Sequence, residues 1–193
     1  MRLSTQFCRL PVRFDVDTLR REALSFPDEA WAAHPNAVPG NSSLRLISAN
    51  GGENDAVDGV MLPTPHLRAA PYIRQVLASF GVVWSRSRLL RLAPGASVPA
   101  HADINYHWHY RVRVHIPIVT APQVLFHCDG QTVHMAPGEA WVRSLSEPES
   151  TASPADSYRG EEVAIVSCGP RAPREIATAV AVRRMRLARD RKS

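Results

Sequence analysis

The sequence predicts a mainly β fold, a sandwich or barrel, that follows a smaller helical part. From Val82 onward the chain consists of short β-prone runs separated by turns such as Ala93-Pro94-Gly95 and Ala136-Pro137-Gly138. Many short strands with regular turns are typical of sandwiches and barrels. Before that point, apolar residues recur at helical spacing. A length of 193 residues suits one domain with a substantial core.

Two helical segments are predicted in the N-terminal part of the chain. Residues 15–33 form the first segment, with Asp17 as its N-cap and a division at Pro27. Residues 66–80 carry apolar side chains at helical spacing, and Pro71 lies near their start.

Loops and strands are predicted for the rest of the chain. Residues 36–59 are rich in Asn, Gly and Pro, which predicts a loop around one short strand, 43–48. Asp129-Gly130 is the kind of pair that forms a tight β-hairpin turn. The other strands are predicted at 88–92, 97–103, 110–119, 123–128, 131–135, 140–143 and 162–167.

Positive charge is concentrated at the C-terminal end. Residues 171–193 hold eight Arg or Lys against two Asp or Glu, a balance of +6; the rest, with 15 basic and 16 acidic residues, carries −1 of the total +5. A body close to neutral gives no electrostatic case for nucleic-acid binding. We therefore expect one domain over 1–170, with its helical part in 1–81, followed by a basic helix or tail over 171–193.

Apolar patterning and cysteine usage favour a cytoplasmic location. No stretch approaches the roughly 18 apolar residues that a membrane-spanning helix needs, and residues 1–14 lack the apolar run of a signal peptide. The three cysteines, Cys8, Cys128 and Cys168, are odd in number and far apart. That spacing argues against a disulfide framework and against a cysteine zinc site. Because the body of the chain is close to neutral and no long apolar stretch is present, neither nucleic acid nor a membrane is expected as a partner.

His101 and Asp103 form the first candidate site. In a strand, residues i and i+2 point to the same face, so this imidazole and this carboxylate can converge on one point. They would supply two arms of the 2-His-1-carboxylate triad that holds Fe(II) and leaves positions open for other ligands. A His-x-Asp triplet also occurs by chance on surface strands, and the triplet alone does not distinguish the two interpretations.

The run 111–119 alternates strictly between two faces of a strand. One face is apolar throughout, and the other carries Arg111, Arg113 and His115. Such a strand could line a pocket for an anion, because guanidinium and imidazole groups pair well with carboxylates. The pattern is equally compatible with a half-exposed antiparallel strand whose polar face is solvated.

Five short segments occur in an order that is more specific than any one of them. They are Pro71-Tyr-Ile-Arg-Gln-Val-Leu77, Arg88-Leu-Leu-Arg-Leu-Ala-Pro-Gly95, Val98-Pro-Ala-His-Ala-Asp103, Arg111-Val-Arg-Val-His-Ile-Pro117 and Val133-His-Met-Ala-Pro-Gly-Glu-Ala-Trp141. With these segments the chain resembles the compact bacterial form of the aspartyl/asparaginyl β-hydroxylase family of Fe(II)/2-oxoglutarate-dependent oxygenases, over most of 60–142. The resemblance implies a double-stranded β-helix (a cupin or jelly-roll fold) with the N-terminal helices packed outside. It also implies Fe(II), 2-oxoglutarate and O2.

The resemblance assigns roles to five residues. His101 is the first metal ligand, and Asp103 takes the carboxylate position. Arg113 and His115 match residues that line the co-substrate pocket. Arg159 falls where the family has an arginine that grips the distal carboxylate of 2-oxoglutarate, a task that suits the two-pronged guanidinium.

The position of the second histidine ligand departs from the family pattern. An ungapped count from Trp141 places Glu149 there. Glu149 could bind the metal, or be a plain loop residue of a weakened or lost metal site. Alternatively the segment takes another path, and His127 or His134 replaces the ligand. The Ser-, Glu-, Pro- and Ala-rich run 144–157 is typical of a surface loop, which slightly favours a weakened or lost site.

Two functional hypotheses follow. The first is an oxygenase that hydroxylates an unactivated C–H bond of an amino acid, free or in a peptide, with Arg111 or a rim arginine holding the substrate carboxylate. The alternative is a catalytically weakened or non-enzymatic cupin-like relative that keeps the pocket. Turnover of 2-oxoglutarate with added Fe(II) separates them. Glu139 resembles a catalytic acid, but it follows a Pro-Gly turn and is expected to be structural.

Overall fold

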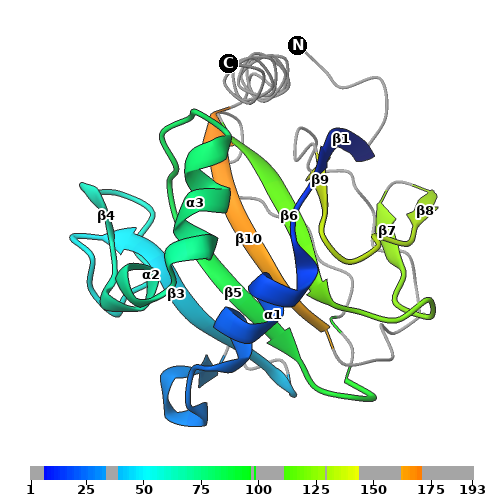
Figure 1. Cartoon of the computed structure of the whole chain (residues 1–193), viewed down its shortest axis with the longest axis horizontal. Helices are drawn as coiled ribbons and strands as arrows, with labels where there is room; N and C mark the ends of the chain where they lie inside the picture. Colours follow the sequence, from blue (N-terminus) through cyan, green and yellow to red (C-terminus); the bar gives the residue numbers. More distant parts are fainter. Residues whose placement is uncertain are drawn as a thin grey trace, which may run out of the picture.

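The computed structural model describes residues 7–33, 39–96, 98, 111–128, 130–143 and 162–170, which build one large antiparallel sheet, a hairpin and a helical layer (Figure 1). The elements are β1 (Phe7–Arg13), α1 (Val16–Leu24), a 3-10 helix (Asp28–Ala30), β2 (Ala32–Ala33), β3 (Asn41–Ala49), β4 (Met61–Pro63), α2 (Pro65–Ala69), α3 (Pro71–Ser79), β5 (Ser87–Leu92), β6 (Arg111–Val119), β7 (Phe126–Cys128), β8 (Gln131–Val133), β9 (Glu139–Arg143) and β10 (Glu162–Pro170). The large sheet has eight strands in the order β1-β9-β6-β10-β5-β3-β2, with β4 paired to β3, and β7 pairs with β8 alone.

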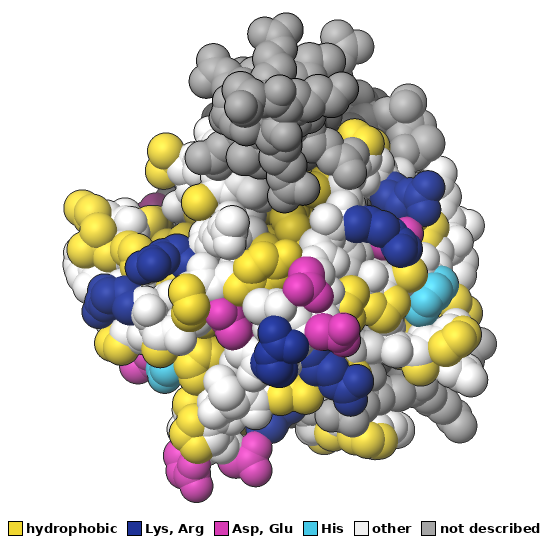
Figure 2. All heavy atoms as spheres, in the orientation of Figure 1, with side chains coloured by type: hydrophobic (Ala, Val, Ile, Leu, Met, Phe, Trp, Pro, Cys, Tyr) yellow, Lys and Arg dark blue, Asp and Glu magenta, His cyan; other side chains and the backbone are white. Residues whose placement is uncertain are grey.

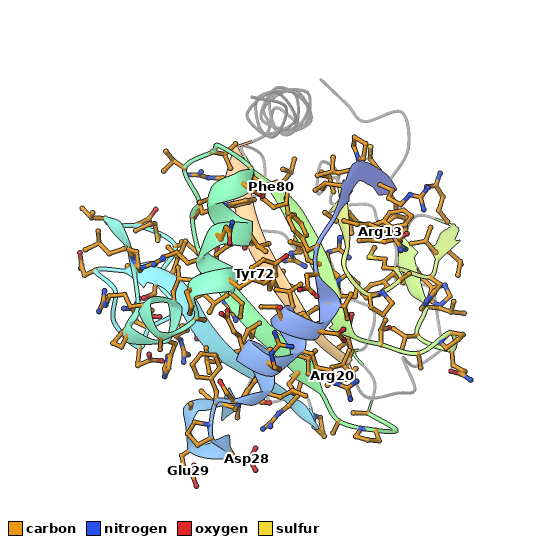
Figure 3. All side chains as sticks on the ribbon, viewed as in Figure 1. Arg13, Arg20, Asp28, Glu29, Tyr72 and Phe80 are labelled. Carbon is orange, nitrogen blue, oxygen red and sulfur yellow. The ribbon has the colours of Figure 1, made fainter. Side chains whose placement is uncertain are left out.

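Helices α1 and α3 lie across one face of the large sheet (Figure 1). The main core forms between these helices and the apolar side chains of β3, β5, β6 and β10. Phe80 is fully buried there, with its ring 5.8 Å from that of Phe14 and 5.3 Å from that of Trp84. Figure 3 shows Phe80 and Tyr72 at opposite ends of α3. Burial of a side chain of this size contributes roughly 1.5–3 kcal/mol, and many apolar side chains of this core are as fully buried.

The N-cap of α1 is Asp15, and the expectation of Asp17 was wrong. The Asp15 carboxylate accepts hydrogen bonds from the backbone N–H groups of Asp17 and Thr18, which places Asp17 in the first turn. Hydrogen bonds from the Thr18 hydroxyl and backbone hold the pKa of Asp15 below its usual range. The helix ends at Leu24, well short of residue 33, because Pro27 cannot continue it and only a 3-10 turn follows.

The single helix predicted over 66–80 is two helices that meet at Pro71. Pro71 has no N–H to donate and occupies the first turn of α3. The Glu22 carboxylate caps α3 from α1, accepting from the N–H groups of Tyr72 and Ile73 at 2.8 Å each. The Tyr72 hydroxyl accepts in turn from the Asp15 N–H at 2.9 Å. The start of α3 is therefore joined to both ends of α1.

Strand β1 was not predicted, although it pairs with β9. Pro11 interrupts the run and argues against a central strand, but β1 lies at the edge of the sheet, where a missing N–H is tolerated. The first 81 residues thus contribute four strands as well as the helices, and only β3 among them was anticipated.

The turn before β9 depends on glycine. Gly138 has φ +75°, and a Cβ atom there would lie 2.7 Å from the backbone oxygen of Phe14. Its N–H donates to Pro117 O and its carbonyl accepts from Phe14 N. The turn therefore joins β6 to the link between β1 and α1.

Most strands of the β part were predicted to within a few residues. The strands predicted at 88–92, 110–119, 140–143 and 162–167 match β5, β6, β9 and β10, while β7 and β8 are shorter than expected. The segments predicted as a strand at 97–103 (except Val98) and as a basic helix or tail at 171–193 lie outside the described residues.

The outer surface over α1 and α3 carries interspersed acidic and basic side chains around apolar ones (Figure 2). This mixture matches the near-neutral charge of the body of the chain. Among the described residues, no helix has the length and apolar character needed to cross a membrane.

Candidate functional site

The face of the sheet that points away from the helices is polar where it crosses β6 and β10. Successive side chains alternate between the two faces of a strand. On β6, Val112, Val114, Ile116 and Ile118 belong to the helix-covered core. The opposite face, called the inner face below, carries Arg113, His115 and Pro117 on β6, Glu162, Ala164, Val166 and Cys168 on β10, and Arg88 and Leu90 on β5.

A buried histidine–glutamate pair lies on the inner face. His115 Nε2 is 2.9 Å from Glu162 Oε1, and the two side chains are only 10% and 9% exposed. The ring of Phe126 meets that of His115 edge to face, with centroids 4.8 Å apart. Phe126 packs with Leu92 and Val124 in a second apolar cluster. This cluster covers one end of the inner face and keeps water from the pair.

Positive charge gathers at the other end of the inner face. Arg113 is the register partner of Cys168, and Arg88 is the register partner of Val166. Burial, together with the charge of Arg86, lowers the pKa of Arg88 to about 10. Arg88 nevertheless stays protonated at neutral pH, so the inner face is cationic near these side chains.

Asp55 balances part of this charge from the loop between β3 and β4. Its carboxylate lies 2.7 Å from Arg45 Nη2 and 3.1 Å from Arg88 Nη2, and its carbonyl accepts from Arg86. Burial alone would raise the pKa of Asp55, but the hydrogen bond from Arg45 and the charge of Arg88 hold it below its usual range. The cluster anchors the loop to β3 and β5.

The structure places two of the predicted site residues together. Arg113 and His115 lie two residues apart on the inner face, as the alternation of 111–119 predicted. His101, Asp103, Glu149 and Arg159 lie outside the described residues, and their roles stay predictions.

The substitute ligands considered for Glu149 do not share a face with His115. Phe126 faces His115, and the next residue, His127, therefore points to the opposite face of the β7–β8 hairpin. The Nδ1 atom of His127 pairs with the Thr132 hydroxyl at 2.8 Å, and that of His134 with Val124 O at 3.0 Å. Each contact uses only one ring nitrogen, and His127 Nε2 is buried without a hydrogen-bond partner among the described residues, so the replacement of Glu149 by either histidine stays a prediction.

Glu139 is structural, as its place after a Pro-Gly turn predicted. Its buried carboxylate accepts from Arg9 and Arg13 on β1 at 3.0 Å each, and from Ala136 N and Trp141 Nε1. Burial raises the pKa of Glu139, but these hydrogen bonds, led by that from Arg13, hold it below the usual range. The group fastens β1 to the turn before β9.

Sequence reasoning missed Glu162 as a site residue. It was taken only as the first residue of a strand. A signal was present, because a charged residue opens an otherwise apolar run, Val163-Ala-Ile-Val166, and shares its strand face with Ala164. Its partner His115 lies 47 residues away, and that pairing depends on the strand register.

The described strands form an eight-stranded antiparallel sheet with helices on one face and a polar second face, together with the separate β7–β8 hairpin. Similar solved structures place this fold in the double-stranded β-helix class. Residues 56–155, more than half of the chain, match the family model of aspartyl/asparaginyl β-hydroxylase. The chain belongs to this family of hydroxylases. No curated protein matches the sequence closely enough to count as a relative.

Solved structures confirm the fold. An oxidoreductase of the 2OG-Fe(II) oxygenase family from Burkholderia pseudomallei has a TM-score of 0.57 at 16% identity, covering 87% of this chain and 85% of its own. A prolyl-4-hydroxylase from Pseudomonas putida has 0.52 at 13%, covering 87% and 94%. HygX from Streptomyces hygroscopicus, with nickel, 2-oxoglutarate and hygromycin B bound, has 0.51 at 12%, covering 88% and 84%.

Proposed function

We propose that the protein is an Fe(II)/2-oxoglutarate-dependent hydroxylase that acts on an unactivated C–H bond of an amino acid, free or within a peptide. The observation that carries the proposal is the inner face. Within a family of hydroxylases, this chain has a partly buried Arg113 and a buried His115 on one polar sheet face, bordered on one side by an apolar cluster. A buried surface with a few convergent polar groups is the usual form of a small-molecule site.

The inner face suits an anionic co-substrate. Arg113 supplies a guanidinium, which pairs with carboxylates in a two-pronged geometry. His115 supplies a second polar group two residues away on the same strand face. In the proposed enzyme, Arg113 and His115 line the pocket and Arg159 holds the distal carboxylate of 2-oxoglutarate.

The metal site would use residues outside the described part of the chain. Among the described residues, no group of three or more His, Cys, Asp or Glu side chains could hold a metal ion. We assign His101 and Asp103 as ligands, with Glu149 as the candidate third.

Each part of the chain would then have a separate task. When bound, Fe(II) with 2-oxoglutarate and O2 supplies the oxidising power for C–H hydroxylation, with succinate and CO2 as by-products. Arg113 and His115 orient the co-substrate, and the cluster of Leu92, Val124 and Phe126 excludes water. Arg111, exposed in part at the start of β6, is the candidate for the substrate carboxylate.

The proposal is tested by succinate formation from 2-oxoglutarate with added Fe(II), in the wild type and in Glu149→His. If residue 149 faces the metal, the histidine variant rebuilds a two-histidine, one-carboxylate site, which should bind Fe(II) more selectively over Mg²⁺, a metal that prefers oxygen ligands. We expect weak turnover by the wild type and stronger turnover by the variant.

The other outcomes are informative. A wild type as active as the variant would mean that the native ligand set is already complete. Two inactive proteins with native circular dichroism would contradict the proposed activity and favour a non-enzymatic relative that keeps the pocket.

A further inference from the structure

We propose that Glu162 is a positioning residue that holds the His115 ring so that Nδ1 is presented to the bound co-substrate. The inference rests on the proposed function, because it assigns the ligand of His115 as 2-oxoglutarate. It adds a residue that lies outside the family-model match, which ends at residue 155.

Two contacts fix the imidazole of His115. The Glu162 carboxylate lies 2.9 Å from Nε2, and the edge-to-face contact with Phe126, at 68° between the ring planes, sets the tilt of the ring. With the Glu162 carboxylate as the acceptor, Nε2 is the donor of the pair. Nδ1 receives no hydrogen bond from the described residues, and it is the ring atom left for a ligand.

The strand register is compatible with the contact between His115 and Glu162. His115 is the register partner of Val166, four residues after Glu162, so both side chains must extend along the strands to meet. The residues between them on the inner face are Pro117 and Ala164, which are register partners. The side chains of Pro117 and Ala164 are both short, and they lie beneath the His115–Glu162 pair.

A purely architectural role explains the pair less well. β6 and β10 are already joined by a ladder that runs from Val119–Val163 to Arg111–Pro170. A buried ion pair contributes little net stability, because the desolvation of both charges offsets their attraction. The pair is therefore superfluous for strand pairing, but it determines the orientation of His115.

The test compares Glu162→Ala and Glu162→Gln with a matched control, Glu22→Ala. Glu22 is also a carboxylate that accepts hydrogen bonds in a fixed geometry, but it lies on the helix-covered face. The measurement is 2-oxoglutarate binding by anaerobic calorimetry to protein loaded with Mn(II), without turnover. Glu162→Ala should weaken binding about 10-fold or more, as expected for loss of an oriented hydrogen bond to a charged group.

The conservative variant separates positioning from general damage. The amide oxygen of Glu162→Gln can still accept from Nε2, so its binding should stay within about 3-fold of the wild type. Glu22→Ala should lower the melting temperature and leave 2-oxoglutarate binding unchanged. A folded Glu162→Ala protein that binds like the wild type would overturn the inference.

A second readout does not depend on the ligand. Long-range ¹H–¹⁵N spectra of histidine side chains report whether each ring nitrogen carries hydrogen. The Nε2–H signal of His115 should be present in the wild type and in Glu162→Gln, and should weaken or disappear in Glu162→Ala. An unchanged spectrum in Glu162→Ala overturns the inference. A wild type that shows the expected spectrum but binds no 2-oxoglutarate overturns the proposed function instead.

Discussion

The two faces of the large sheet differ in what holds them together. The helix-covered face is apolar, and its side chains pack against α1 and α3 in one continuous core. The inner face carries Arg88, Arg113, His115 and Glu162, all on strands that also contribute to that core. A single strand such as β6 serves both faces because its side chains alternate.

The difference indicates a division of labour. Packing of apolar side chains supplies stability on one face, whereas buried charges on the other are costly to desolvate. A fold tolerates such charges where the backbone ladder is already strong, as it is between β6 and β10. Local features that conflict with stability tend to mark functional sites.

The largest stability effect is expected from the apolar face. Phe80→Ala removes a fully buried ring that contacts Phe14 and Trp84, and should cost about 3–5 kcal/mol of unfolding free energy. Chemical denaturation measures the loss. The unfolding free energy of Phe80→Leu, which keeps most of the apolar volume, should lie between those of the wild type and Phe80→Ala. If 2-oxoglutarate binding by the folded Phe80→Ala protein also collapses, the separation of the two faces is wrong.

A smaller effect should follow the titration of Asp55. Its pKa is lowered in the folded state, so its contribution is present above the unfolded pKa of about 4 and is lost as the pH falls through the folded value. The partly exposed pairs with Arg45 and Arg88 contribute on the order of 1 kcal/mol.

Stability measured between pH 7 and pH 3 checks this linkage. The acid loss should be shallower in Asp55→Asn, which has no charge to lose. Identical pH profiles for the two proteins would show that Asp55 does not titrate differently in the folded and unfolded chains.

Much of the fold could be predicted from the sequence, because alternation and turn residues are local signals. The strands β5, β6, β9 and β10 and the placement of Arg113 and His115 on one face followed from such patterns. Long-range contacts could not be predicted. Asp15 rather than Asp17 caps α1, Glu22 caps α3 from another helix, and Glu162 meets His115, each because tertiary packing decides between local alternatives.

Metal-dependent ligand binding tests the central claim most directly, namely that the polar side of this β-helix binds a metal with 2-oxoglutarate. Calorimetry under anaerobic conditions should show one Mn(II) site in the wild type and 2-oxoglutarate binding only when Mn(II) is present. His101→Ala should abolish both, because the ring supplies the first metal ligand of the proposed site. A folded His101→Ala protein that binds Mn(II) and 2-oxoglutarate as the wild type does would contradict the account.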